Sequence, residues 1–402
     1  MNICFLTISS FNMSINGIYT DLIHYLIKHG HRVTVICPEQ RRNCQNTQID
    51  AHDTLKILRV KTLNITGQCH LVEKGLGLIL LEHQFIQAIK LHLANDHFDC
   101  VLYSTPPMTF GGVVSYLKKR DKASTYLLLK DIMPQGAVDL GLFSKFSPPW
   151  VYFRWKEKQL YAISDHIGCM SPANCSYVLK HNPTIDPSKV EVNPNSLFPR
   201  HINRDRTLLT KYGISQNKTI FVYGGNLGRP QGIDFLLQCI ASNENRNNTH
   251  FVVAGTGSER KRVEHFFEIQ RPQHSTLLPY LPKAEYESLC AACNVGLVFL
   301  DKRFTFPNFP SRILSYMQAE MPYIAAVDSV TDVGTIAETN NFGMNCLWGD
   351  IEHFNYCVET LAESPTQICE RGQTAKQYFL EHYTVEQSYQ IIMQHFKRDK
   401  NV

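Results

Sequence analysis

The chain has 402 residues, of which 44% are hydrophobic and 19% charged, with a formal net charge of +4. This length exceeds what one hydrophobic core usually supports, so two domains are expected. The mild charge argues against a nucleic-acid-binding protein, and no uncharged apolar run approaches the length of about 20 residues that spans a bilayer.

Strands and helices alternate through the first half of the chain. A strand at 2–8 leads through a loop containing Gly17 into a helical pattern at 16–29, and a second strand follows at 31–37. This order predicts the start of a parallel, doubly wound sheet. The further expected elements are strands at 55–60, 100–103, 125–129 and 166–170, and helices at 77–95, 111–119, 149–162 and 172–180.

A second α/β domain follows a linker. Residues 193–204 contain two prolines and no periodicity, which is typical of a connecting segment. The alternation then restarts, with strands at 219–223, 250–254, 276–278, 295–300 and 323–327, and helices at 235–241, 259–268, 283–292 and 312–319. We therefore expect domains at 1–198 and 199–380, and a C-terminal helix within 381–402 that packs back toward the first domain.

Three loops of the second domain follow predicted strands and precede predicted helices. They cover 224–232, 254–259 and 306–312, and the first two are rich in glycine. Ser311 is expected to cap the helix that begins at Arg312. Ligands bind at the carboxyl ends of parallel strands, so the three loops are expected on one rim.

The same loops carry the chemistry of an anion site. Unpaired backbone amides at a helix N-terminus attract anions, and glycine leaves them accessible. Arg229 and Arg312 would add two cations that suit a diphosphate. Ordinary turn glycines and surface arginines are the alternative interpretation.

Other nucleotide motifs are absent from the sequence. The segment Gly255-Thr256-Gly257 has Arg260 where a dinucleotide fingerprint needs glycine, which disfavours a nicotinamide enzyme. There is no P-loop and no DxD pair for Mg²⁺. Protein cations and helix amides would therefore have to neutralise a departing diphosphate.

Two loops of the first domain also follow strands. Ser104 and Thr105 follow the strand at 100–103, and Lys130 and Asp131 follow the strand at 125–129. We expect the first three side chains to meet an acceptor. Asp131 could orient or polarise an acceptor hydroxyl, although a helix cap or an ion-pair partner is the alternative.

The segment 148–158 combines Trp, Tyr and Phe with Arg and two Lys. An aromatic and basic helix of this kind suits a bilayer surface with anionic lipids, whereas packing of its aromatic side on the sheet is the alternative. The basic run at 118–120 would favour the membrane interpretation if it lay on the same face. The chain shows no targeting signal, and thirteen scattered cysteines suit reduced, buried thiols, which predicts a cytoplasmic location.

Taken in order, these segments resemble the GT-B glycosyltransferases of the retaining family-four type, which build bacterial surface polysaccharides. The resemblance is closest to O-antigen and capsule enzymes that transfer an N-acetylated 6-deoxyhexosamine such as N-acetyl-L-fucosamine. The motifs that carry it are KDIMPQGAVDLG (130–141), SDHIGCMSPAN (164–174), KVEVNPNS (189–196), GGNLGRPQGID (224–234), VVAGTGSE (252–259) and FPSRILSYMQAEMPYIA (309–325).

The resemblance implies an α/β GT-B fold of two Rossmann-like domains that face a central cleft. Domain 199–380 would bind a UDP-sugar, and domain 1–198 would bind a polyprenyl-diphosphate-linked saccharide at the inner face of the cytoplasmic membrane. No metal, other cofactor or nucleic acid is implied. Retention would come from attack on the leaving-group side, with the departing phosphate oxygen accepting the proton of the acceptor.

The site residues follow from the motifs and the resemblance together. Asp131 is the catalytic candidate, and the acceptor-binding candidates are Ser104, Thr105 and Lys130. The donor-binding candidates are Gly17, Gly225, Asn226, Arg229, Gly255, Thr256, Gly257, Glu259, Tyr280, Leu281, Ser311 and Arg312.

The chain departs from the family pattern at four positions. A Glu-x7-Glu pair of many members is replaced by Pro307 and Ser315, and a basic pair by Asn226 and Gln231. The residue that holds the donor sugar ring is therefore not assigned. A GT-B sugar-nucleotide epimerase and a non-enzymatic sugar-binding protein are the alternatives to a transferase.

Overall fold

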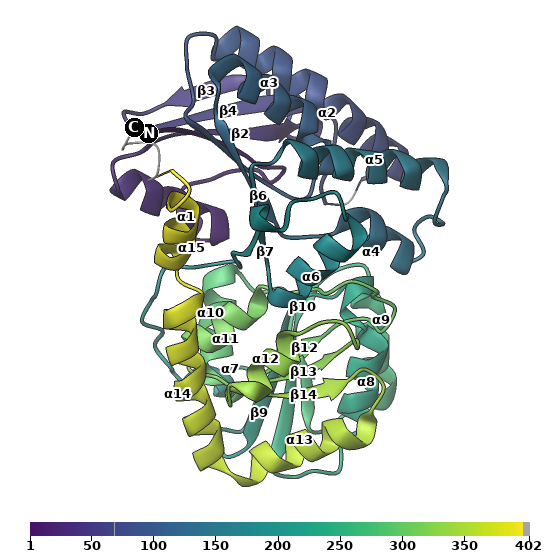
Figure 1. Ribbon diagram of the computed structural model, residues 1–402. Helices are drawn as coiled ribbons and strands as arrows, with labels where there is room; N and C mark the ends of the chain where they lie inside the picture. Colours follow the sequence, from purple (N-terminus) through teal and green to yellow (C-terminus); the bar gives the residue numbers. More distant parts are fainter. Residues whose placement is uncertain (68, 397–402) are drawn as a thin grey trace. The chain divides into compact units, whose positions relative to one another are not determined.

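The computed structural model describes residues 1–67 and 69–396, which form two compact units (Figure 1). The first unit contains residues 1–198 and the segment from Val385 onward, and the second contains Pro199–Thr384. The second boundary thus lies at 384 rather than 380, because helix α14 (Pro365–His382) continues past the expected end. Residues 397–402 of the expected C-terminal helix lie outside the described part.

The first unit is built on an eight-stranded sheet in the order β3-β4-β2-β1-β5-β6-β7-β8. Neighbouring strands pair in parallel except β3 and β4, which are antiparallel. The strands are β1 (Asn2–Leu6), β2 (Arg32–Gln40), β3 (Gln48–Ala51), β4 (Leu55–Thr62), β5 (Cys100–Ser104), β6 (Ser124–Leu129), β7 (His166–Cys169) and β8 (Val190–Val192). The central strands are continuous apolar runs, as expected for a sheet covered on both faces.

Helices cover both faces of this sheet (Figure 1). Right-handed crossovers from β4 through β8 put α2, α3, α5 and α6 on one face, and the opposite step from β1 to β2 puts α1 on the other. Helix α15 packs on α1 through Ile392 and Met393. The helices are α1 (Ile18–Lys28), α2 (Leu71–His92), α3 (Gly111–Asp121), α4 (Met133–Asp139), α5 (Pro148–Ile163), α6 (Pro172–His181) and α15 (Val385–Met393).

The second unit has a six-stranded, fully parallel sheet in the order β11-β10-β9-β12-β13-β14. The strands are β9 (Thr219–Asn226), β10 (Thr249–Thr256), β11 (Ser275–Leu277), β12 (Val295–Phe299), β13 (Tyr323–Val327) and β14 (Gly343–Leu347). The helices, besides α14, are α7 (Thr207–Lys211), α8 (Ile233–Ser242), α9 (Arg260–Gln270), α10 (Lys283–Ala292), α11 (Arg312–Gln318), α12 (Val333–Thr339) and α13 (Ile351–Glu363).

Every strand and helix expected from the sequence has a counterpart in the structure. The strands β3, β8 and β14 and the helices α4, α7 and α12 to α14 were not predicted, and α2 begins at Leu71 rather than at residue 77. Within the described residues, none of the helices combines the length and apolar character needed to cross a membrane.

Candidate functional site

Two glycine-containing loops lie against each other where β9 and β10 end. The strands pair in register through Gly225 beside Gly255 and end with Asn226 beside Thr256. Beyond this point, the amide of Leu227 donates to the carbonyl of Thr256 at 2.8 Å, and the amide of Glu259 donates to the carbonyl of Leu227 at 2.8 Å. The first two loops predicted from the sequence therefore form one connected surface at the carboxyl edge of the sheet.

The close approach of these loops depends on glycine. Gly255 has a φ of +158°, and a Cβ there would come within 1.9 Å of the carbonyl oxygen of Gly225. A side chain at this position would force the two loops apart. The backbone can thus approach a ligand without obstruction by side chains.

Arg312, at the start of α11, is a cation without a matching anion. Its guanidinium lies 4.5 Å above the ring centre of Tyr223, and its Nη2 donates to Oε1 of Gln231. The Nη1 atom is buried and has no hydrogen-bond partner. Among the described residues, no carboxylate forms an ion pair with Arg312.

The surroundings keep Arg312 protonated. Burial disfavours its charge, but the neighbouring phenols of Tyr223 and Tyr316 more than offset this and hold the pKa above its ordinary value. The Arg312 guanidinium also lies against Gly225, since a Cβ on that glycine would be 3.7 Å from Arg312 Cζ. A buried positive charge therefore stands directly beside the glycine loop of β9.

Arg229 has a different environment. Its side chain is 61% exposed, and its Nε lies 3.9 Å from Oε1 of Glu259. Together they line a cavity of about 280 Å³ with two further arginines and two aspartates, so the charges there balance. No described contact joins Arg229 to Arg312, and the expectation that both face one small region remains a prediction.

Ser311 does not cap α11. It has helical backbone angles (φ −66°, ψ −14°) and makes no side-chain capping bond, so the capping prediction is wrong. A capping residue needs an extended backbone for its side chain to reach the first free amides.

The other donor-binding candidates lie on exposed or half-exposed loops. Asn226, Thr256 and Gly257 are exposed around the paired loops, Leu281 is half-buried, and Tyr280 is 72% exposed. Gly17 precedes α1 in the first unit with an extended backbone. Their contacts with a donor, and those of Ser311 and Glu259, remain predictions.

The acceptor-binding candidates of the first unit are brought together by Thr105. Its Oγ1 accepts hydrogen bonds from the amides of Lys130, at 3.0 Å, and Asp131, at 3.3 Å. Ser104 and Thr105 are both buried. The ends of β5 and β6 are therefore fixed to each other at the carboxyl edge of the first sheet.

Lys130 and Asp131 are titratable groups in unusual surroundings. Lys130 Nζ donates to the backbone carbonyl of Asn193 at 3.3 Å, and burial lowers the pKa of Lys130 to about 7. The Asp131 side chain keeps an exposed surface, yet the density of protein around the carboxylate disfavours its charged form and raises its pKa to about 6. No described ion pair involves Asp131, which leaves its carboxylate available to a ligand.

Tyr19 is a neighbour of this cluster that the sequence did not indicate. It lies on α1, and burial raises its pKa to about 12, while a hydrogen bond with Ser104 acts to lower the pKa and the charge of Asp131 acts to raise it. A single tyrosine within a helix forms no motif, and only the packing of α1 on the sheet places it here.

The aromatic and basic helix α5 agrees with neither prediction completely. Lys156 and Glu157 are buried, whereas Trp155 is 51% exposed. In the basic run at 118–120, Lys118 pairs with Asp165 and Arg120 with Asp121. That this run shares a face with α5 remains a prediction.

The described residues contain no group of three His, Cys, Asp or Glu side chains that could hold a metal ion. The candidate residues at the two strand edges supply arginine, lysine and carboxylate side chains, hydroxyl groups and backbone amides.

Two family models match the chain in succession. Residues 18–197 match Glycosyltransferase Family 4, and residues 205–350 match Glycosyl transferases group 1. The probable glycosyltransferase WbjE of Pseudomonas aeruginosa is 24% identical over 274 residues, which cover 67% of this chain and 68% of WbjE.

Solved structures support the same fold. Sucrose-phosphate synthase from Thermosynechococcus elongatus superposes with a TM-score of 0.76 at 14% identity, over 99% of this chain and 98% of that one. Anabaena HepE in complex with UDP superposes with a TM-score of 0.70 at 14% identity, over 99% and 100% of the two chains. With its two parallel-sheet units and its two successive family matches, the chain is a glycosyltransferase of the GT-B fold with a family-four N-terminal region.

Proposed function

We propose that this glycosyltransferase transfers a sugar from a UDP-sugar to a polyprenyl-diphosphate-linked saccharide, with retention of configuration and without a metal. The resemblance of its motifs to O-antigen and capsule enzymes favours an N-acetylated 6-deoxyhexosamine as the sugar. The reaction would take place at the inner face of the cytoplasmic membrane. The observation that carries the proposal is the unmatched, buried guanidinium of Arg312 beside the glycine loops.

A bound diphosphate would complete this arrangement. Burying a cation without a partner costs free energy, and an anion that meets it recovers that cost. Arg312 presents a planar fork of N–H donors, and the donors on its Nη1 have no partner. The structure of HepE contains UDP, which favours a uridine diphosphate as the anion.

The first unit would supply the acceptor side of the reaction. Thr105 accepts hydrogen bonds from the backbone amides of Lys130 and Asp131, so the backbone that carries the Asp131 side chain is fixed in position. It would accept a hydrogen bond from the attacking hydroxyl and orient it. Lys130, whose partner is a backbone carbonyl, would meet a negative group of the acceptor while it is protonated.

The bonds broken and formed in the transfer balance without a covalent bond to the protein. The bond between C1 of the sugar and the diphosphate oxygen breaks, and a bond from C1 to the acceptor oxygen forms on the same face. The acceptor proton passes to the departing phosphate oxygen, and Arg312 stabilises the charge that develops there.

A transfer assay in EDTA tests this proposal. Purified protein, a UDP-linked N-acetylated 6-deoxyhexosamine and a polyprenyl-diphosphate saccharide should give one product per UDP released, with unchanged anomeric configuration by NMR. A product of inverted configuration would rule out the mechanism, and a requirement for Mg²⁺ would show that protein cations do not suffice.

A further inference from the structure

One side of helix α2 exposes large apolar side chains. Val72, Leu76, Ile79 and Leu80 are 61%, 51%, 50% and 45% exposed. Their spacing of i, i+4, i+7 and i+8 puts them on a single stripe of the helix, which normally faces a core. Here no described residue covers them.

Helix α5 and the residue stretch before it show the same feature. Phe146 is 73% exposed, and Val151 and Trp155, one helical turn apart, are 52% and 51% exposed. On the opposite side of α5, Leu160 and Tyr161 are buried in the unit. The helix therefore presents aromatic and apolar groups outward as well as inward.

The two stripes face the same way. Both helices connect parallel strands on one face of the sheet, so α2 and α5 run in roughly the same direction (Figure 1). They meet where Lys156 Nζ lies 2.5 Å from Oε2 of Glu82. Successive helical residues are about 100° apart around the helix axis. By this measure, Glu82 lies about 100° around α2 from its exposed stripe, and Lys156 lies about 100° around α5 from its exposed stripe, in the opposite sense. Helix α3 contacts both helices, and the ion pair between Lys156 and Glu82 bridges them. Because α2 and α5 are roughly parallel, that geometry points both stripes in one direction.

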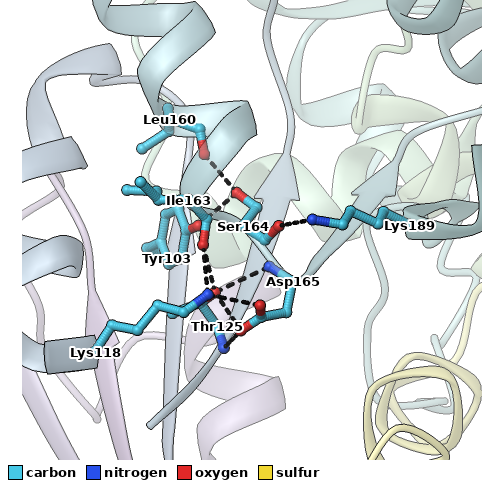
Figure 2. A network of polar contacts seen from close by, with 8 residues as sticks. All are labelled: Tyr103, Lys118, Thr125, Leu160, Ile163, Ser164, Asp165 and Lys189. Atoms are coloured by element: carbon cyan, nitrogen blue, oxygen red, sulfur yellow. Dashed lines mark hydrogen bonds and ion pairs between the residues drawn. The ribbon is translucent and has the colours of Figure 1, made fainter. Parts of the chain in front are cut away.

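Polar contacts fix α5 at its C-terminal end (Figure 2). The carbonyl of Ile163 accepts hydrogen bonds from Lys118 Nζ at 2.9 Å and Thr125 Oγ1 at 3.0 Å. Ser164 Oγ lies 2.6 Å from the hydroxyl of the buried Tyr103. The exposed stripe therefore belongs to an anchored helix.

Two lysines complete an interfacial pattern. Lys145 Nζ lies 5.5 Å from the ring centre of Phe146, and Lys158 is exposed within one turn of Trp155. Neither forms an ion pair with a carboxylate in the described part of the chain. Exposed Trp and Phe beside unpaired Lys suit the headgroup region of a bilayer that contains anionic lipids.

We propose that the α2–α5 face, formed by Val72, Leu76, Ile79, Leu80, Phe146, Val151 and Trp155, docks on a bilayer containing anionic lipids. The N-terminal ends of both helices lie at the carboxyl edge of the sheet, which also carries Asp131. Docking would thus hold the acceptor-side edge at the membrane. This inference rests on the proposed lipid-linked acceptor and adds the surface that meets the lipid.

Vesicle flotation of the full-length protein tests the inference. We expect binding to phosphatidylcholine vesicles that contain phosphatidylglycerol, and weaker binding without it. The face variant, Ile79→Ser combined with Trp155→Ser, should lower the partition coefficient between vesicles and water at least about ten-fold, since it loses two apolar side chains that would be buried in the bilayer. Lys145→Ala combined with Lys158→Ala should reduce the gain from phosphatidylglycerol.

The matched control is Ile269→Ser combined with Tyr356→Ser. Ile269 and Tyr356 are 61% and 60% exposed and both lie in the second unit, so neither belongs to the α2–α5 face. The control should float like wild type. Wild type that does not bind vesicles, a face variant that binds normally, or a control that loses binding equally would each overturn the inference.

The inference and the proposed function fail in distinguishable ways. UDP binding and transfer to a short-chain, water-soluble acceptor report on the function alone, and the face variant should leave both unchanged. In contrast, the transfer of sugar by the face variant to a full-length polyprenyl acceptor in vesicles should fall as its partition coefficient for vesicles falls.

Discussion

Arg312→Ala should lower kcat/KM by about 10³-fold, equivalent to about 4 kcal/mol, while the unliganded protein keeps or gains stability. The loss follows because Arg312 is the cation we assign to the leaving diphosphate. The stability is preserved because the substitution removes a buried charge whose Nη1 has no partner. Steady-state kinetics and thermal unfolding without ligand measure the two effects.

Arg246→Ala is the matched control. Arg246 is also a partly buried arginine of the second unit, but it pairs with Glu359 at 3.1 Å. Its loss should change kcat/KM less than about three-fold, as expected for an ordinary ion pair near the surface. A ten-fold or smaller effect of Arg312→Ala would refute its assigned role.

Asp131→Asn should lower kcat by about 10³-fold with little effect on the KM for the donor. Asparagine keeps the shape of the side chain but cannot carry the charge that orients the acceptor hydroxyl. The pKa of Asp131 is raised to about 6, so its carboxylate is charged above that pH and protonated below it. Wild-type activity should therefore decline as pH falls through about 6.

The pH profile separates orientation from a structural role. In Asp131→Asn the decline near pH 6 should disappear, because no group titrates at that position. Asp186→Asn, in which the replacement can still accept the capping bond from the amide of Ser188, should behave like wild type. If the activity of Asp131→Asn still declined near pH 6, the decline would come from the titration of another group.

The alternation of strands and helices was predictable because buried parallel strands are short apolar runs bounded by glycine and polar residues. The short edge strands β3, β8 and β14 have three to five residues and lack such runs. They depend on pairing with a neighbour already in place. No periodicity in a short window identifies such strands.

The start of α2 shows how tertiary packing overrides propensity. The sequence predicted a helix that begins at Gly77, yet α2 begins six residues earlier and runs through both Gly75 and Gly77. A Cβ at Gly77 would come within 2.4 Å of Ile65 Cγ2, so this glycine allows the helix to pack closely on the chain before it. Sequence alone does not show which neighbour requires the small residue.

The candidate site was only partly accessible from sequence. The glycine loops and Arg312 follow from local motifs, and the structure connects the first two loops through Leu227. The stacking of Arg312 on Tyr223 and the approach of Tyr19 to Ser104 depend on contacts between separate elements. Arg229 shows the converse, since its motif suggested a free cation and the fold places Glu259 beside it.

Calorimetric titration of the protein with UDP in EDTA, compared with GDP, ADP and CMP, tests the central claim most directly. The account predicts selective UDP binding without metal, weakened at least about ten-fold by Arg312→Ala, since one charge-assisted contact to the diphosphate is lost. Binding that requires Mg²⁺, or that is equally strong in the Arg312→Ala variant, would contradict a donor site built on this cation.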